Sequence, residues 1–224
     1  MMSFKTQDSL AEQIAQFLSQ RIFSSELTPG ERIQEMRIAS ELNVSRGSVR
    51  EAFLILQQRY LIDIIPRKGA VVSELTEKHL HDLFDVHSML ICHISRHLAK
   101  ECSVEQRRSL VQTLDLMERY VASEQIEQFL DGLLNFTRML SDAYGNAYIQ
   151  SQVNDLLPVL QRAMRLPRQP TSTALAQILR LLHQLSGAID RRASDIIEDL
   201  VTQYNGSLQQ FVFSSSEEAC LEVD

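Results

Sequence analysis

A mainly α-helical protein built from two parts is predicted by three observations on the sequence. The composition favours helix, because the 224 residues include 7 Gly, 5 Pro and no Trp, whereas Leu, Ile, Gln and Glu are abundant. Apolar residues recur at helical spacing along most of the chain. Two short runs rich in β-branched residues interrupt this pattern once, within residues 61–73. We therefore expect a small domain of helices and one hairpin, followed by an all-helical antiparallel bundle.

Three helices are expected before the hairpin. The first covers residues 8–24, where Ser9 is a suitable N-cap, and the Thr-Pro-Gly run at 28–30 ends it. A short second helix runs to Leu42, and Asn43 is a suitable left-handed exit. Ser45 caps a third helix of about 15 residues. Its apolar stripe contains Val49, Ala52, Phe53 and Leu56, and its other face carries Arg46, Ser48 and Arg50.

Two strands are expected next, over residues 61–65 and 70–73. The intervening Pro-Arg-Lys-Gly run at 66–69 has the composition of a tight turn. Three helices followed by such a hairpin form the layout of a winged helix-turn-helix. In that fold the start of the third helix enters the major groove of DNA, and the wing tip reaches the backbone or the minor groove. Residues 1–74 are therefore interpreted as a DNA-binding domain.

The rest of the chain is expected to be helical. The pattern predicts six helices, over residues 75–100, 104–121, 124–143, 147–166, 171–188 and 192–213, with breaks at residues 102–103, 122–123, 145–146 and 167–170. Because the linkers are short, neighbouring helices are expected to pack antiparallel. Residues 75–213 form the expected second domain. Residues 214–224, which hold four acidic residues and no basic one, are expected to be a disordered tail.

Charge and composition narrow the classes of function. The net charge of −7 argues against an indiscriminate coat on nucleic acid, but residues 1–74 carry nine basic and nine acidic residues, so one face can still be basic. No apolar run approaches the ~20 residues of a membrane span. Cys92, Cys102 and Cys220 lack the spacing of a metal knuckle, and no hydrolase, phosphate-loop or zinc-protease motif is found. We expect a cytoplasmic protein that is not an enzyme and does not bind membranes.

Three ordered stretches carry a resemblance to a known family. They read LTPGERI at residues 27–33, ASELNVSRGSVREA at 39–52 and RKGAVV at 67–72. Together they resemble the GntR family of bacterial transcription regulators, and the helical remainder is similar to the FCD effector domain of its FadR subfamily. The resemblance implies a homodimeric regulator, commonly a repressor, that binds a short palindromic operator in double-stranded DNA. It also implies that a small molecule in the helical domain, such as an organic acid or an acyl compound, modulates this binding.

The resemblance also implies which residues contact DNA. They lie on the second helix, at the start of the recognition helix and at the wing tip: Arg37, Ser45, Arg46, Gly47, Ser48, Arg50, Arg67, Lys68 and Gly69. The chemistry agrees, because arginine can donate to guanine O6 and N7 together, while hydroxyls and helix N-terminal amides suit phosphate oxygens. Gly47 stands where the family usually has Thr or a similar residue. A hydrogen-bond donor is lost there, so we expect a different operator preference.

The resemblance further predicts that the family's metal site is absent. Many FCD domains hold a divalent cation with an Asp-x3-His pair and two later histidines, and this cation grips a carboxylic acid. The matching positions here are Leu133, Thr137, Leu182 and Tyr204, and none is a usual ligand type. We expect no metal cofactor. The polar candidates for effector contacts inside the bundle are His87, Asn135, Arg138, His183 and Tyr204.

Several alternatives stay open at the level of sequence. The effector is a metal-independent acid, a larger apolar ligand, or absent altogether. His93 and His97, four residues apart, are able to chelate zinc if another ligand completes the shell, or they are ordinary bundle or interface histidines. For the whole chain, the alternative function is a protein-interaction bundle with a vestigial winged helix and no effector. Salt-dependent binding to duplex DNA discriminates the two functions.

Overall fold

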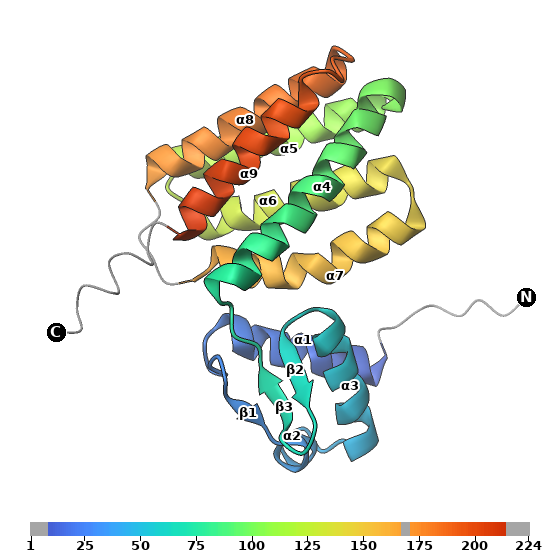
Figure 1. Ribbon diagram of the computed structural model, residues 1–224, viewed down its shortest axis with the longest axis vertical. Coiled ribbons are helices and arrows are strands. Elements are labelled where there is room, and N and C mark those ends of the chain that lie inside the picture. Colours follow the sequence, from blue (N-terminus) through green and yellow to red (C-terminus); the bar gives the residue numbers. More distant parts are fainter. Residues whose placement is uncertain (1–8, 167–170, 214–224) are drawn as a thin grey trace, which may run out of the picture. The chain divides into compact units, whose positions relative to one another are not determined.

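The computed structural model describes residues 9–166 and 171–213 (Figure 1). The chain divides into two compact units, Met1–Thr76 and Glu77–Asp224. The predicted mainly helical class is confirmed, since the described residues form nine helices and one small antiparallel sheet. The predicted break at residues 167–170 and the predicted tail at residues 214–224 lie outside the described residues.

Three helices build the first unit: α1 (Leu10–Phe23), α2 (Glu35–Glu41) and α3 (Arg46–Gln58). Both predicted caps are confirmed, because the hydroxyls of Ser9 and Ser45 accept hydrogen bonds from backbone N–H groups three residues later. Asn43 has a φ of 52°, as expected for the left-handed exit of α2. The apolar faces of the three helices meet in one core. Its most deeply buried residues are Ala15, Leu18, Val49, Ala52, Leu56 and Leu61.

The sheet of this unit has three antiparallel strands, β1 (Arg32–Ile33), β2 (Ile62–Ile65) and β3 (Gly69–Val72), in the order β1-β3-β2. The predicted hairpin of β2 and β3 is confirmed, whereas β1 was not predicted, because two residues are too few to show an alternating pattern. At the hairpin turn, the Lys68 N–H donates to the Ile65 carbonyl oxygen at 3.1 Å. Pro66 in the second position and Arg67 with a φ of 66° in the third are typical of a type II turn.

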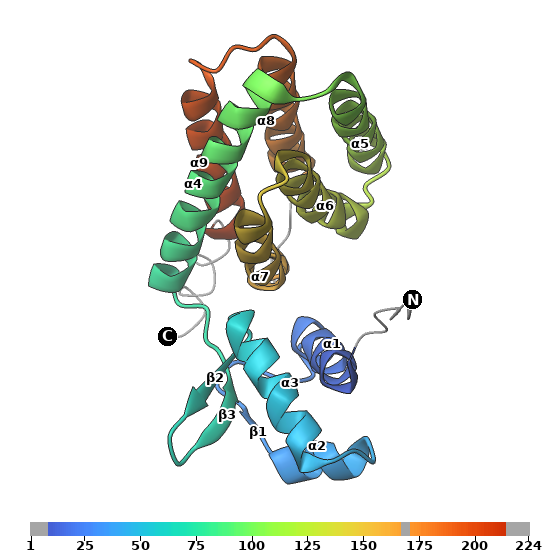
Figure 2. The same ribbon diagram turned by 90° about the vertical axis from the view of Figure 1, so that its right-hand side faces the viewer.

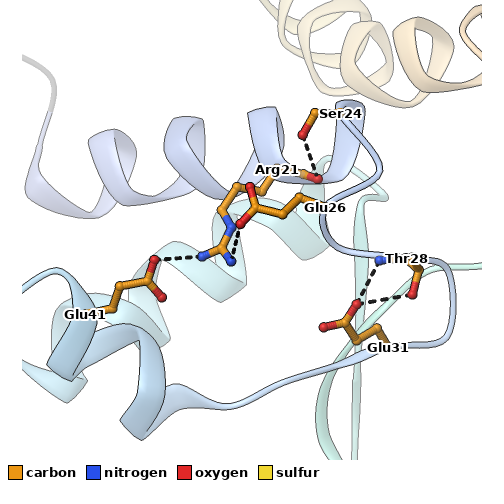
Figure 3. Close-up of polar contacts among 6 residues, drawn as sticks. All are labelled: Arg21, Ser24, Glu26, Thr28, Glu31 and Glu41. Atoms are coloured by element: carbon orange, nitrogen blue, oxygen red, sulfur yellow. Dashed lines mark hydrogen bonds and ion pairs between the residues drawn. The ribbon is translucent and has the colours of Figure 1, made fainter.

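Arg21 ties α1 to two other segments (Figure 3). Its Nη1 lies 3.0 Å from Oε1 of Glu41 at the end of α2, and its Nη2 lies 2.6 Å from Oε1 of Glu26 in the following loop. Further along the loop, Glu31 accepts hydrogen bonds from both the N–H and the hydroxyl of Thr28, which holds the pKa of Glu31 below its ordinary value. These contacts fix the loop between α1 and β1 and the end of α2 relative to α1.

The second unit is a bundle of six helices (Figures 1 and 2). They are α4 (Glu77–Glu101), α5 (Val104–Ala122), α6 (Ile126–Tyr144), α7 (Ala147–Met164), α8 (Ser172–Asp190) and α9 (Ile197–Phe213). Helices adjacent in sequence pack together in the pairs α5–α6, α6–α7 and α8–α9, and α4 packs against α6, α7, α8 and α9. The six predicted helices are confirmed. The last begins later than expected, because a turn with Arg192 at a φ of 59° follows α8.

The bundle core contains one buried histidine. His87 of α4 is 4% exposed, and its Nδ1 has no hydrogen-bond partner among the described residues. Its ring lies 6.2 Å from the ring of Tyr204 on α9, measured between centroids. Burial lowers the pKa of His87 to about 4 and raises the pKa of Tyr204, since a low-dielectric environment disfavours the charged form of each group. Both side chains are therefore neutral at neutral pH.

We predict that the bundle loses stability as the pH falls from 6.5 towards about 4. In this interval His87 takes up a proton in the unfolded chain but not in the folded one, so the free energy of unfolding falls by up to about 3 kcal/mol. Urea unfolding followed by circular dichroism at about pH 7 and about pH 5 measures the change. His87→Leu should remove most of it, whereas His81→Gln, at an exposed site, should keep it. An equal pH dependence in wild type and His87→Leu contradicts the prediction.

We also predict opposite effects of alanine at two helical glycines. A Cβ at Gly132 of α6 would lie 2.7 Å from Cγ of the buried Met117 on α5, whereas a Cβ at Gly206 of α9 would meet nothing within 4 Å. Gly132→Ala should lower the free energy of unfolding by about 1 kcal/mol, because overpacking outweighs the gain in helix propensity. Gly206→Ala should raise it by up to about 1 kcal/mol. Urea titrations test both, and a stabilised Gly132→Ala variant would rule out the close approach.

Candidate nucleic-acid interface

The start of α3 carries several of the residues that the family resemblance predicts to contact DNA. Ser45 caps the helix by accepting from the Ser48 N–H at 3.0 Å, and the two hydroxyl oxygens lie 2.9 Å apart. Arg46 and Arg50 follow, with side chains 57% and 63% exposed. Because residues four apart share one helix face, both guanidinium groups project from the same side of α3. The buried residues of α3, Val49, Ala52, Phe53 and Leu56, face the core of the unit.

A carboxylate that sequence reasoning missed joins the two arginines. Glu35, the first residue of α2, accepts from Arg46 Nε at 2.6 Å and from Arg50 Nε at 2.7 Å. The hydrogen bonds from Arg50 and Arg46 hold the pKa of Glu35 below its ordinary value. The carboxylate is therefore ionised at neutral pH. No local motif signals the contact, because it spans the turn between α2 and α3.

A groove of about 740 Å³ runs beside these arginines, between the helices α2 and α3 and the wing formed by β2 and β3. Arg32 of β1 also lines it and is a second residue that sequence reasoning did not single out. The apolar part of the lining is Ile33, Met36, Phe53, Leu54, Ile64 and Ala70. The groove thus combines basic side chains with apolar surface on one side of the unit.

Gly69 shapes the wing beside this groove. Its φ is +86°, a conformation that residues with a Cβ rarely adopt. A Cβ built on Gly69 would lie 3.8 Å from Arg32 Nε, so the glycine lies against that guanidinium. Arg67 and Lys68 occupy the neighbouring turn and are exposed. The wing turn and the adjacent strand β1 therefore carry three cationic residues, Arg32, Arg67 and Lys68.

Of the predicted DNA-contact residues, Arg46, Arg50 and Gly69 line the groove, whereas Arg37 and Gly47 do not. Arg37 is exposed on α2, but it does not line the groove and instead lies close enough to Glu31 to help lower the pKa of that carboxyl group. Gly47 is not required by the backbone, because a Cβ there would meet Ser45 Oγ at 3.6 Å, an ordinary contact distance. The missing side chain at Gly47 therefore affects the exposed surface of α3 more than its folding.

The candidate effector residues do not all lie inside the bundle. His87 and Tyr204 do, but Asn135 and Arg138 are exposed on α6, so the expectation of an interior position is wrong for both. The helical period explains the correction, since the interior positions of α6 are taken by Leu133, Leu134, Phe136, Thr137 and Leu140.

His183 is also placed differently from the sequence-based expectation. It is half-buried on α8 and lines a surface groove with Arg107 and Arg108 of α5. Its neighbours Leu181, Leu182 and Leu185 take the buried positions of α8. The expectation that His183 lies inside the bundle is therefore wrong.

The four positions that the resemblance assigns to a metal do lie inside the bundle. Leu133, Thr137, Leu182 and Tyr204 are each at most 5% exposed. The Thr137 hydroxyl donates to the carbonyl oxygen of Leu133 at 3.1 Å, and the raised pKa of Tyr204 keeps its phenol protonated. The described residues contain no group of three or more His, Cys, Asp or Glu able to hold a metal ion. This donor set does not fit a divalent cation.

His93 and His97 pack around one tyrosine. His93 Nε2 lies 3.0 Å from the Tyr144 hydroxyl of α6, and the His97 ring meets the Tyr144 ring edge-on at 4.5 Å. His97 Nε2 also lies 3.5 Å from a carboxylate oxygen of Glu101. The contacts with Tyr144 join α4 to α6, in agreement with an ordinary role in helix packing.

Within the described ranges, no helix is both long and apolar enough to cross a membrane.

Comparisons with known proteins agree with this division of the chain. Residues 10–72 match the model of bacterial regulatory proteins of the gntR family, and residues 82–206 match the FCD domain. The gluconate operon transcriptional repressor of Bacillus subtilis is 32% identical over 153 residues, which cover 68% of this chain and 63% of that protein. The match thus spans less than two thirds of that relative. The HTH-type transcriptional repressor RspR of Escherichia coli is 23% identical over 201 residues, which cover 90% and 88% of the two chains.

Solved structures share the fold over nearly the whole chain. A GntR transcriptional regulator from Rhodococcus sp. RHA1 has a TM-score of 0.70 at 19% identity and covers 93% of this chain and 99% of its own. E. coli McbR/YncC has a TM-score of 0.69 at 16% identity, with 97% and 100% covered. The FCD match alone spans more than half of the chain, and the gntR match spans the unit that carries the groove. The chain therefore belongs to the GntR family of bacterial transcriptional regulators, with a C-terminal FCD domain.

Proposed function

We propose that this protein is a transcriptional repressor that binds a specific operator through α3 and the wing. The observation that carries the proposal is the pair Arg46 and Arg50, exposed on one face at the start of α3 and next to a groove with basic side chains. Guanidinium groups in this position suit the acceptor edge of guanine in the major groove. The exposed Arg67 and Lys68 of the wing suit backbone phosphates.

The protein acts as a homodimer in this proposal. Two copies of α3 occupy the half-sites of a short palindrome, because the two-fold symmetry of a dimer matches that of the DNA sequence. The helical unit supplies the dimer contacts in this proposal. As a DNA-binding regulator the protein works in the cytoplasm and catalyses no reaction.

A small molecule modulates operator binding without a metal ion in this proposal. The FCD match supports an effector, and the leucines at two of the four metal positions argue against a metal-bound carboxylate. His87 and Tyr204 offer neutral polar groups in the bundle core instead. A ligand that binds one arrangement of the bundle more tightly than another shifts the population of the operator-binding state. A metal-independent acid and an acyl compound are the two ligand classes to test.

We predict that Arg46→Ala and Arg50→Ala each weaken operator binding by about tenfold or more, because each removes a base-reading guanidinium. The probe is a duplex that the wild-type protein selects from a random pool, and fluorescence anisotropy measures its affinity over a range of salt concentrations. Arg96→Ala is the control, since Arg96 pairs with Glu198 in the helical unit. Light scattering should show the same oligomer for all variants. Unchanged affinity in both α3 variants would exclude α3 as the recognition helix.

Native mass spectrometry of the purified protein tests the dimer and the metal together. We expect a dimer that carries no metal ion, because Leu133 and Leu182 cannot coordinate a cation. A retained small molecule would appear as an adduct and identify the effector class. A dimer with one Zn²⁺ or Ni²⁺ per chain would refute the metal-free proposal and return metal-bound carboxylic acids to first place.

A further inference from the structure

The two ion pairs of Glu35 use the same atom of each arginine. Oε1 of Glu35 accepts from Arg46 Nε, and Oε2 accepts from Arg50 Nε. Each carboxylate oxygen therefore serves a different guanidinium. The side chain of Glu35 is 20% exposed, whereas those of Arg46 and Arg50 are 57% and 63% exposed. The carboxylate thus binds the Nε atom of each guanidinium group, while the rest of each arginine side chain is largely exposed to solvent.

The choice of Nε matters for base recognition. A guanidinium carries five N–H groups, one on Nε and two each on Nη1 and Nη2. An acceptor on Nε leaves the Nη1 and Nη2 groups available for a second acceptor, and guanine O6 and N7 form a suitable pair. A carboxylate bound across Nη1 and Nη2 would instead compete with the base. The contact geometry is therefore compatible with simultaneous binding of Glu35 and DNA.

We propose that Glu35 is a positioning residue for sequence recognition: it holds Arg46 and Arg50 through their Nε atoms with the Nη groups directed to the bases. This inference rests on the proposed DNA-binding function and names the residue that sets its specificity. The lowered pKa of Glu35 is in keeping with this role, because the carboxylate stays ionised beside the arginines.

Glu35 affects specific and non-specific binding in opposite directions. It orders two long side chains before DNA arrives, so less rotamer freedom is lost when the bases are bound. Its negative charge also opposes the phosphate backbone, which supplies most of the non-specific affinity. The ratio of specific to non-specific affinity is therefore the quantity that Glu35 controls.

The test compares Glu35→Gln with wild type on two duplexes. One is selected by the wild-type protein from a random pool, and the other has the same base composition in shuffled order. Glu35→Gln removes the charge and one of the two acceptors, so affinity for the selected duplex should fall about tenfold. Affinity for the shuffled duplex should stay the same or rise. Glu51→Gln, which makes the same charge change at an exposed site on α3, is the matched control and should keep the wild-type ratio.

A mutant cycle separates positioning from general support of the fold. In an Arg46→Ala, Arg50→Ala background, Glu35→Gln should leave the affinity ratio unchanged, because nothing remains to be positioned. Glu35→Asp retains the charge but shortens the side chain, and it should lower the ratio without lowering the melting temperature of the protein.

Each other outcome overturns the inference in a recognisable way. A parallel rise in both affinities means that Glu35 only repels phosphate. A parallel fall, with a lower melting temperature in both Glu35→Gln and Glu35→Asp, means that it only supports the fold. An unchanged ratio while wild type still selects a duplex refutes positioning and leaves the proposed function standing. Failure of the wild-type protein to select any duplex refutes the proposed function itself.

Discussion

The proposed DNA-binding surface, formed by the start of α3 and the wing, depends on the burial of one face of α3. Val49, Ala52 and Leu56 are completely buried against α1 and the neighbouring elements of the first unit. Because this stripe is fixed in the core, α3 cannot rotate about its axis, and Arg46 and Arg50 stay at the surface. The same burial brings the start of α2 beside α3, and only then can Glu35 meet both guanidinium groups. Core packing, surface charge and the proposed base recognition are thus successive consequences of one apolar stripe.

The core of the bundle differs from the surface at the start of α3, because the polar side chains in the core are uncharged. Leu133 and Leu182 occupy two of the four positions that the family resemblance assigns to metal ligands. Two buried polar side chains of the bundle, His87 and Tyr204, are uncharged at neutral pH. A buried neutral imidazole with an unpartnered nitrogen costs less free energy than a buried ion but still lacks one hydrogen bond. A ligand able to complete that hydrogen bond would recover part of this cost on binding.

Sequence reasoning succeeded where the information is local. Caps at Ser9 and Ser45, the exit at Asn43 and the helical periods depend on residues within one or two turns of one another. Sequence reasoning failed where the contacting residues are distant in sequence, and where residues on one helix had to be divided between the buried and the exposed face. Glu35 lies 11 and 15 residues from its two partners, and β1 exists only because β3 pairs with it. The outward positions of Asn135 and Arg138 follow from the apolar stripe of α6, a pattern that is present in the sequence but was not applied to these two residues.

The short strand β1 links the two parts of the recognition surface mechanically. Ile33 of β1 pairs with Ala70 of the wing, and only Gln34 separates Ile33 from Glu35. The backbone thus connects the wing to the carboxylate that contacts both arginines. In the proposed function, this connection makes the wing and α3 act together when they bind DNA. A strained or bent operator would then be sensed at the bases and at the backbone in a single cooperative step, with energetic coupling between substitutions in the two elements.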